Sequence, residues 1–427
     1  MNQNKIIGKD HQFVWHPFTH LNYAETPIHI VKGEGVYFFD NEGNPLIDAI
    51  SSWWVNLHGH CHPYVSRKVS EQLNTLEHAI FSGFTHEPAV ILAERLIGHL
   101  PENQSKIFYS DNGSTAVEVA LKMVLQYWHN QGLNKRKFIA FENAYHGDTF
   151  GGMSVGARNV FNNAFENLLF DVIHIPLPNS ENMDDLINTI KTWIYHHHDI
   201  AGFIFEPLVQ GAAGMFMFEA EYLDRLISLF RENKILCIAD EVMTGFGRTG
   251  EFFASNYLTH KPDIICLSKG LTGGYMPLGV TSCAQFIYDA YKSDDKTKTF
   301  FHGHSYTANP LSCAAALASL DLMEKSETWN QIRLISESHA QFVKKHQFHE
   351  KLNDIRCKGT IVALELKTSE HTHYLNNASE SIASFFIKKG IIIRPLGNVL
   401  YLIPPYCITL AQLNEIYTAI EEFLAQL

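Results

Sequence analysis

Residues 263–270, DIICLSKG, form a short apolar run that ends in serine, lysine and glycine. A second run at residues 235–239, ILCIA, ends in Asp240 and Glu241. Both runs are short, β-rich and bounded by polar residues, which is typical of strands buried in a parallel sheet. The carboxyl ends of the strands in such a sheet form the ligand crevice. We therefore expect Lys269 and Asp240 to reach one pocket.

Further apolar runs on either side predict the rest of the sheet. Strands are predicted at residues 107–109, 138–141, 203–205, 236–239 and 264–267. Helical segments separate these runs, and that alternation indicates a mainly parallel sheet covered on both faces.

The ends of the chain have a different pattern. Residues 28–48 predict a hairpin that turns at residues 40–43. Strands are predicted at residues 361–366, 391–393 and 399–403, and a final helix begins at Thr409, where Gln412 completes a capping box.

The expected fold class is α/β, with a large domain built on a mainly parallel sheet between helices and a smaller α+β domain. We expect the large domain at residues 66–325 and the small domain at residues 326–427. Residues 1–65 are expected to associate with the small domain.

Composition excludes several classes of function. The 427 residues carry 33 Lys and Arg against 45 Asp and Glu, a net charge of −12, which argues against nucleic-acid and membrane partners. No apolar stretch approaches the length of a membrane span, and the N-terminus has no signal-peptide core. Seven scattered cysteines without a Cys-x-x-Cys pair indicate a reduced, cytoplasmic chain.

Two histidine clusters, at residues 58–62 and 196–198, raise the question of a metal. The first lies among glycine and proline, and the second follows an amphipathic segment. Neither has the ligand spacing of structural or catalytic zinc sites, so we expect no metal.

The pair formed by Lys269 and Asp240 is what pyridoxal 5′-phosphate (PLP) requires. A lysine forms a Schiff base with the aldehyde of this cofactor, and an acid keeps its ring nitrogen protonated so that the ring accepts electrons. An isolated Ser-Lys-Gly is usually a solvated loop, so the interpretation depends on finding other parts of the site.

A phosphate site is predicted where a helix follows the strand at residues 107–109. A helix N-terminus offers unpaired N–H groups and the positive end of a dipole. Gly113 lets an anion approach the backbone, and Ser114 adds a hydroxyl. The alternative is an ordinary helix cap, and only Lys269 favours phosphate over it.

Two more strand ends contribute candidates. Tyr145, after the strand at residues 138–141, is placed to stack on a flat ring. Gln210 is a candidate for bonding a ring hydroxyl, and Glu206 a structural residue. Residues 245–250, GFGRTG, are not followed directly by a helix pattern, so we interpret them as an active-site loop carrying Arg248 rather than a nucleotide loop.

Taken together, these blocks resemble the class III, fold-type-I PLP-dependent aminotransferases along almost the whole chain. The motifs that carry the resemblance are at residues 112–114, 145–148, 206–207, 239–242, 245–250, 268–270 and 308–310. Within that family, residues 15–18, 51–54, 126–128, 145–149, 394–397 and 401–406 resemble the branch that serves biotin synthesis. That branch converts 8-amino-7-oxononanoate (KAPA) to 7,8-diaminononanoate (DAPA).

The resemblance implies a role for individual positions in a homodimer with shared active sites. Lys269 would hold the cofactor, Asp240 would pair with its ring nitrogen, and Tyr145 would take part in catalysis beside them. Gly113 and Ser114 would bind the phosphate with His304 and Ser305 of the neighbouring subunit. Substrate contacts would come from Phe18, Trp53, Tyr145, Lys269, Gly303 and Arg394. A guanidinium binds a carboxylate at two points, which suits the carboxylate of KAPA.

Two departures bear on the substrates. Phe18 stands where many members of the branch have a tyrosine. Residues 274–277 and 302–307 are closer to relatives that use lysine as the amino donor, whereas the paired Trp53 and Trp54 favour S-adenosylmethionine, the donor we prefer. The alternatives are lysine, another ω-amino-acid or diamine aminotransferase, a decarboxylase or aminomutase on the same scaffold, and a non-catalytic PLP-binding protein.

Overall fold

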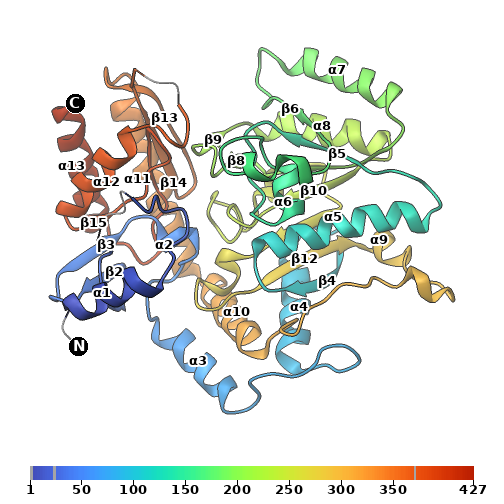
Figure 1. Ribbon diagram of the computed structural model, residues 1–427, viewed down its shortest axis with the longest axis horizontal. Coiled ribbons are helices and arrows are strands. Elements are labelled where there is room, and N and C mark those ends of the chain that lie inside the picture. Colours follow the sequence, from blue (N-terminus) through green and yellow to red (C-terminus); the bar gives the residue numbers. More distant parts are fainter. Residues whose placement is uncertain (1–2, 23–25, 370–371) are drawn as a thin grey trace.

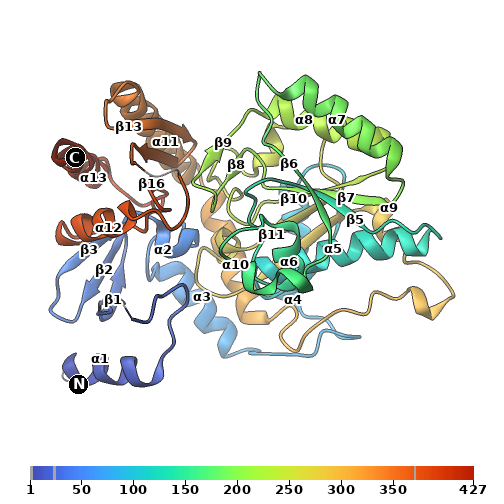
Figure 2. The same ribbon diagram turned by 45° about the horizontal axis from the view of Figure 1, so that its top comes forward.

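The computed structural model describes residues 3–22, 26–369 and 372–427, which form two lobes lying side by side (Figure 1). The larger lobe is built on a seven-stranded sheet. The smaller lobe combines the beginning of the chain, drawn in blue, with its end, drawn in orange and red (Figure 2).

The large sheet contains one antiparallel strand among parallel ones. From edge to edge its strands are β4 (Gln104–Ser110), β12 (Gly279–Ala284), β11 (Ile264–Leu267), β10 (Leu236–Asp240), β7 (Ile200–Phe205), β5 (Lys137–Phe141) and β6 (Val172–Ile175). Strand β12 runs antiparallel to both neighbours. The five strands predicted from the sequence are confirmed, and β6 and β12 were missed.

Alternating side chains bury both faces of this sheet. In β5, Phe138 and Ala140 face one core, and Ile139 and Phe141 face the other. Helices α5 (Gly113–Asn130) and α9 (Gln285–Asp289) cover the first face. The second face is covered by α4 (Glu87–His99), α7 (Met183–His196), α8 (Ala220–Glu232) and α10 (Pro310–Met323).

The small lobe joins the two ends of the chain in one sheet. That sheet contains β1 (Ile30–Glu34), β2 (Tyr37–Asp40), β3 (Pro45–Asp48) and β15 (Ile391–Ile392). Strand β15 pairs in parallel with β3, with Ile391 opposite Ile47. The predicted hairpin is present as β2 and β3, which turn between Asp40 and Asn44.

A second small sheet contains β13 (Leu352–Lys358), β14 (Ile361–Leu366) and β16 (Val399–Leu402). The surrounding helices are α11 (Ser326–His346), α12 (Ala378–Lys388) and α13 (Leu410–Gln426). The predicted capping box of Thr409 and Gln412 is confirmed at the start of α13. Shorter elements are α1 (Gln3–Phe13), α2 (Ser51–Trp54), α3 (Pro63–Leu73), α6 (Phe150–Val155), β8 (Val209–Gln210) and β9 (Phe216–Met217).

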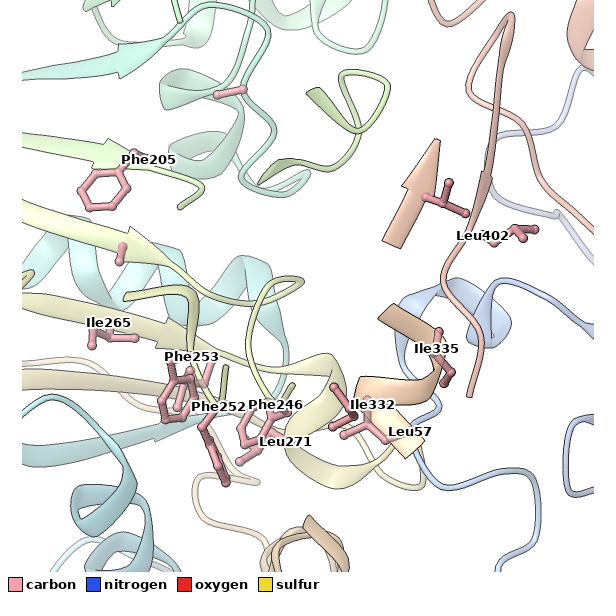
Figure 3. Packing of buried hydrophobic residues seen from close by; sticks show 14 of the residues in the cluster. Leu57, Phe205, Phe246, Phe252, Phe253, Ile265, Leu271, Ile332, Ile335 and Leu402 are labelled. Carbon is pink, nitrogen blue, oxygen red and sulfur yellow. The ribbon is translucent and has the colours of Figure 1, made fainter. Parts of the chain in front are cut away.

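One hydrophobic core continues from the large sheet into the small lobe. Figure 3 shows Phe205 and Ile265 of the sheet on one side and Ile335 of α11 and Leu402 of β16 on the other. Burial of this continuous apolar surface holds the lobes together. None of the helices formed by the described residues is long and apolar enough to cross a membrane.

Candidate active site

The carboxyl ends of the parallel strands open into one cavity of about 740 Å³. Because those ends meet at one edge of the sheet, side chains that are distant in sequence converge there. The predicted residues that line the cavity are Phe18, Trp53, Gly113, Ser114, Tyr145, Asp240, Lys269 and Arg394. The pairing of Lys269 with Asp240 in one pocket is therefore found in the structure.

Lys269 follows β11 and carries its amine into the cavity. Its φ of 41° lies in the left-handed region, which is strained for a residue with a side chain. Nζ lies 4.6 Å from the centre of the Trp54 ring. Burial lowers the pKa of this amine to about 8, although the carboxylates of Asp240 and Glu206 act in the opposite direction. The neutral form of Lys269 is therefore far more populated near neutral pH than that of an exposed lysine.

Asp240, at the end of β10, is held by two donors. Its Oδ2 lies 2.7 Å from Nδ1 of His146, and its Oδ1 accepts the N–H of Val242 at 3.1 Å. The side chains of Asp240 and His146 are both buried. The other ring nitrogen of His146, Nε2, is buried without a hydrogen-bond partner among the residues described. These contacts fix the direction in which the carboxylate faces the cavity.

Glu206, after β7, holds two parts of the cavity wall. Oε1 accepts the N–H of Tyr145 at 3.1 Å, and Oε2 accepts the N–H of Gly211 at 2.9 Å. Burial raises the pKa of this carboxyl group to about 7, and the Asp240 charge acts in the same direction. Glu206 thus has the structural contacts expected from the sequence, and it also fixes the backbone of Tyr145.

Helix α5 points its N-terminus at the cavity. Asn112 caps the helix and accepts the N–H of Thr115 at 3.0 Å in a capping box. A Cβ atom at Gly113 would lie 2.7 Å from a methyl group of Val242, so no larger residue fits without a shift. Ser114 Oγ accepts the N–H of Asp148 at 3.3 Å. The ordinary helix cap that was the alternative to a phosphate site is therefore present. The first turn of α5 also lines the cavity, so the cap does not exclude a phosphate site there.

The opposite side of the cavity is aromatic and carries a cation. The guanidinium of Arg394 lies 4.6 Å from the centre of the Trp53 ring. Trp54 donates from Nε1 to the hydroxyl of Tyr401 at 2.9 Å. Phe18 has a φ of 49° and contacts Trp53 edge to face at 5.4 Å. Phe18, Trp54 and Lys269, which all line the cavity, are among the non-glycine residues with positive φ.

The remaining predicted residues do not line this cavity. Gly303, His304 and Ser305 lie in a loop before α10, where the backbone N–H of His304 donates to Thr307. Gln210 is fully buried, and its Nε2 donates to the carbonyl of Glu142 at 3.1 Å. Its Oε1 has no hydrogen-bond partner among the described residues, so the bond from Gln210 to a ring hydroxyl stays a prediction.

The interpretation of Arg248 as an active-site residue is wrong, because Arg248 is not among the residues that line the cavity. Its side chain is buried away from the cavity and donates to the carbonyls of Pro404 at 2.8 Å and Asn56 at 2.9 Å. Burial lowers the pKa of its guanidinium. Arg248 joins the large lobe to both ends of the chain.

The histidines of residues 58–62 have structural partners. His58 bonds to Ser319 Oγ at 2.9 Å, His60 to Asp48 at 2.9 Å, and His62 caps α3 by accepting the N–H of Tyr64. Across the described ranges, no three His, Cys, Asp or Glu side chains gather as they would around a metal ion.

Sequence reasoning missed Phe161 and Tyr374, which line the cavity from irregular segments of different lobes. Neither belongs to a strand end, a helix cap or a glycine loop, so no local pattern singled them out.

The family model described as aminotransferase class-III matches residues 19–424. This chain is a class III aminotransferase. It is 46% identical over 424 residues to adenosylmethionine-8-amino-7-oxononanoate aminotransferase of Synechococcus elongatus, with 98% of this chain and 99% of the relative covered.

Solved structures of transaminases share the fold of the chain. The crystal structure of adenosylmethionine-8-amino-7-oxononanoate aminotransferase from Methanocaldococcus jannaschii has a TM-score of 0.93 at 35% identity and covers 99% of each chain. A PLP-bound amine transaminase from an uncultivated Pseudomonas species has a TM-score of 0.89 at 32% identity, with 97% of this chain and 98% of that chain covered. The α/β fold predicted from the sequence is confirmed.

Proposed function

We propose that this class III aminotransferase transfers an amino group from S-adenosylmethionine to KAPA and produces DAPA for biotin synthesis. The observation that carries the proposal is one cavity in which Lys269 and Asp240 face a helix N-terminus on one side and Arg394 on the other. The names of the relatives at 35–46% identity supply the reaction.

The cofactor of the proposed reaction is PLP, and the residues present fit this group. The N-terminus of α5 at Gly113 and Ser114 suits its phosphate, and Asp240 suits its ring nitrogen. Tyr145 offers an aromatic face on the same wall. When bound, PLP supplies an aldehyde that condenses with amines and a ring that accepts electrons.

Lys269 holds the cofactor and moves the proton. Its buried amine, with a pKa of about 8, is neutral often enough to accept a proton from the donor carbon. The same nitrogen then returns a proton when the keto substrate is aminated. Donor and acceptor occupy the cavity in turn, so the kinetics are ping-pong.

Arg394 is proposed to bind the carboxylate of KAPA. Its planar fork of donors matches a carboxylate at two points. Trp53, Trp54 and Phe18 line the cavity beside it and suit the methylene chain. Phe18 has no hydroxyl, so it offers the keto substrate no side-chain hydrogen bond.

Two alternatives remain for the substrates. Lysine is the second candidate donor, because residues 274–277 are closer to the lysine-using relatives. A general amine or ω-amino-acid transaminase is the other, because an amine transaminase shares the fold at 32% identity.

The donor is tested by adding S-adenosylmethionine or lysine separately to the PLP-loaded protein, without keto acid, and following the cofactor absorbance. We expect the absorbance band of the lysine-bound cofactor to disappear when S-adenosylmethionine is added and to persist when lysine is added. Loss with lysine alone would assign lysine as the donor, and loss with neither would contradict both assignments. Adding KAPA should then restore the band and release DAPA, identified by mass spectrometry.

The proposal includes a homodimer in which Gly303, His304 and Ser305 of one subunit reach the cavity of the other. Mixed dimers of Lys269→Ala and Ser305→Ala subunits test this sharing. If sites are shared, one site of each mixed dimer has no lesion, and activity exceeds that of either parent dimer. If sites are not shared, mixing gives only the average of the two parents.

The cytoplasmic location expected from the sequence is kept as part of the proposal. All seven cysteines are free, as a reducing compartment requires.

A further inference from the structure

Aromatic rings from three separate segments meet around Phe161 at one side of the cavity. The centre of the Phe161 ring lies 5.9 Å from Phe18, 4.7 Å from Tyr374 and 6.5 Å from Tyr145. Phe18 lies 5.4 Å from Trp53. All of these residues line the cavity.

The rings are arranged like the walls of a box. Neighbouring planes meet at 71° for Phe18 and Trp53, 74° for Phe18 and Phe161, and 66° for Phe161 and Tyr374. Phe18, Trp53, Phe161 and Tyr374 all line one cavity, so rings that stand nearly perpendicular to their neighbours offer a ligand contacts on more than one side.

The segment that presents Phe161 is held by its own hydrogen bonds. The N–H of Phe161 donates to Oδ1 of Asn159 at 3.0 Å. The N–H of Asn159 donates in turn to Oδ1 of Asn162 at 3.0 Å, and the buried Asn162 side chain donates to the carbonyl of Ala157. Phe161 is therefore placed before any ligand arrives, which reduces the entropy lost on binding.

Electrostatics favour a cation in this box. The face of an aromatic ring is negative and attracts cations, with recognised aromatic cages for onium groups. Arg394 already lies 4.6 Å from the centre of the Trp53 ring, so one ring of this set holds a positive charge in the protein itself. The cavity lining carries the carboxyl groups of Asp111, Asp148, Glu206 and Asp240 against the basic side chains of Lys269 and Arg394, so acidic groups outnumber basic ones.

We propose that Phe18, Trp53, Phe161 and Tyr374, here called the aromatic box, recognise the sulfonium group of the amino donor. This inference rests on the proposed function and names the part of the donor that is selected. A sulfonium spreads its charge beneath three alkyl groups and is weakly hydrated, whereas the ammonium of lysine is compact and strongly hydrated. The box therefore favours S-adenosylmethionine over lysine.

The test compares two probes that differ in charge and lack the amino-acid group. The probes are 5′-dimethylsulfonio-5′-deoxyadenosine, a sulfonium, and 5′-methylthioadenosine, its neutral counterpart. Inhibition constants are measured with the PLP-loaded enzyme in competition with whichever donor supports turnover. We expect the sulfonium to bind about tenfold more tightly in the unaltered protein.

Variants assign this preference to the box. Phe161→Leu should reduce the ratio of the two inhibition constants below about threefold. Phe165→Leu, in the same segment but outside the cavity, should leave it unchanged. Tyr374→Leu should act like Phe161→Leu, and Tyr374→Phe should retain the preference because it keeps the ring.

Equal inhibition by both probes in the unaltered protein would overturn the inference, as would an unchanged ratio in both Phe161→Leu and Tyr374→Leu. Failure of S-adenosylmethionine to serve as a donor would instead overturn the proposed function, and the two probes would still report on the box.

Discussion

Lys269 owes its chemistry to burial rather than to its sequence neighbours. Because burial lowers the pKa of its amine to about 8, the neutral fraction rises as pH approaches 8 from below and levels off above it. We expect the rate of PLP capture by the apoprotein to rise about tenfold per pH unit below that value. Stopped-flow absorbance at fixed PLP measures this rate. If the capture rate instead reached half of its maximum near pH 10.5, Lys269 would behave as an ordinary exposed lysine.

Glu206 links stability to pH through its raised pKa. The folded protein binds this proton with a pKa of about 7, against an ordinary value of 4.5, so its contribution to stability falls as pH rises between these values. The full difference is on the order of 3 kcal/mol. We expect Glu206→Gln to gain in free energy of unfolding relative to the unaltered protein as pH rises from 4.5 to 7.5. Urea titrations at pH 4.5 and 7.5 measure the free energy of unfolding of both proteins. If the difference between Glu206→Gln and the unaltered protein were the same at both pH values, the assignment would be contradicted.

Helix α5 depends on close contact between its first turn and Val242, which follows β10. In Gly113→Ala, the added Cβ would lie 2.7 Å from a methyl group of Val242, so the helix start or Val242 must shift, and either movement disturbs the anion site. We expect the dissociation constant of PLP to rise by about tenfold or more. Gly98→Ala in α4 is the matched control, because nothing lies within 4 Å of its Cβ. Equal PLP affinity in Gly113→Ala and Gly98→Ala would show that PLP binding does not need the close approach of the phosphate to the backbone at residue 113.

Local patterns predicted the elements whose signals are strong. The capping box at Thr409 and the apolar runs of β10 and β11 were found because caps and buried strands have characteristic residues. Strand β12, GVTSCA, was missed because its small and hydroxyl residues obscure the apolar pattern. Its buried hydroxyls are bonded instead, with Thr281 donating to the carbonyl of Ala116 at 2.7 Å.

Across the two lobes, Arg248 connects segments that are distant in sequence. It donates to carbonyls before and after the large lobe, at Asn56 and Pro404. In Arg248→Lys, one ammonium cannot reproduce the fork, and buried carbonyls lose their donors. We expect a loss of at least about 2 kcal/mol in the free energy of unfolding. Denaturant titration measures it, with the exposed Arg333→Lys as control, and equal stability would contradict the structural role.

The candidate site was predictable where residues follow strand ends, as for Lys269, Asp240 and Gly113. It was not predictable where tertiary contacts decide the position. Phe161 and Tyr374 reach the cavity from irregular segments, and Arg248 turns away from it despite its glycine-rich loop. The division at residues 65 and 325, and the contribution of His304 from a partner subunit, stay predictions.

The most direct measurement of the central claim uses Lys269→Ala. The proposed phosphate site at Gly113 and Ser114 remains, as does Asp240. The variant should therefore still bind PLP, which equilibrium dialysis would measure. We predict that amino transfer from S-adenosylmethionine to KAPA falls by at least about a thousandfold, because the proton-transferring amine is gone. The surface variant Lys191→Ala should keep full turnover. Turnover of Lys269→Ala near that of the unaltered protein would contradict the account.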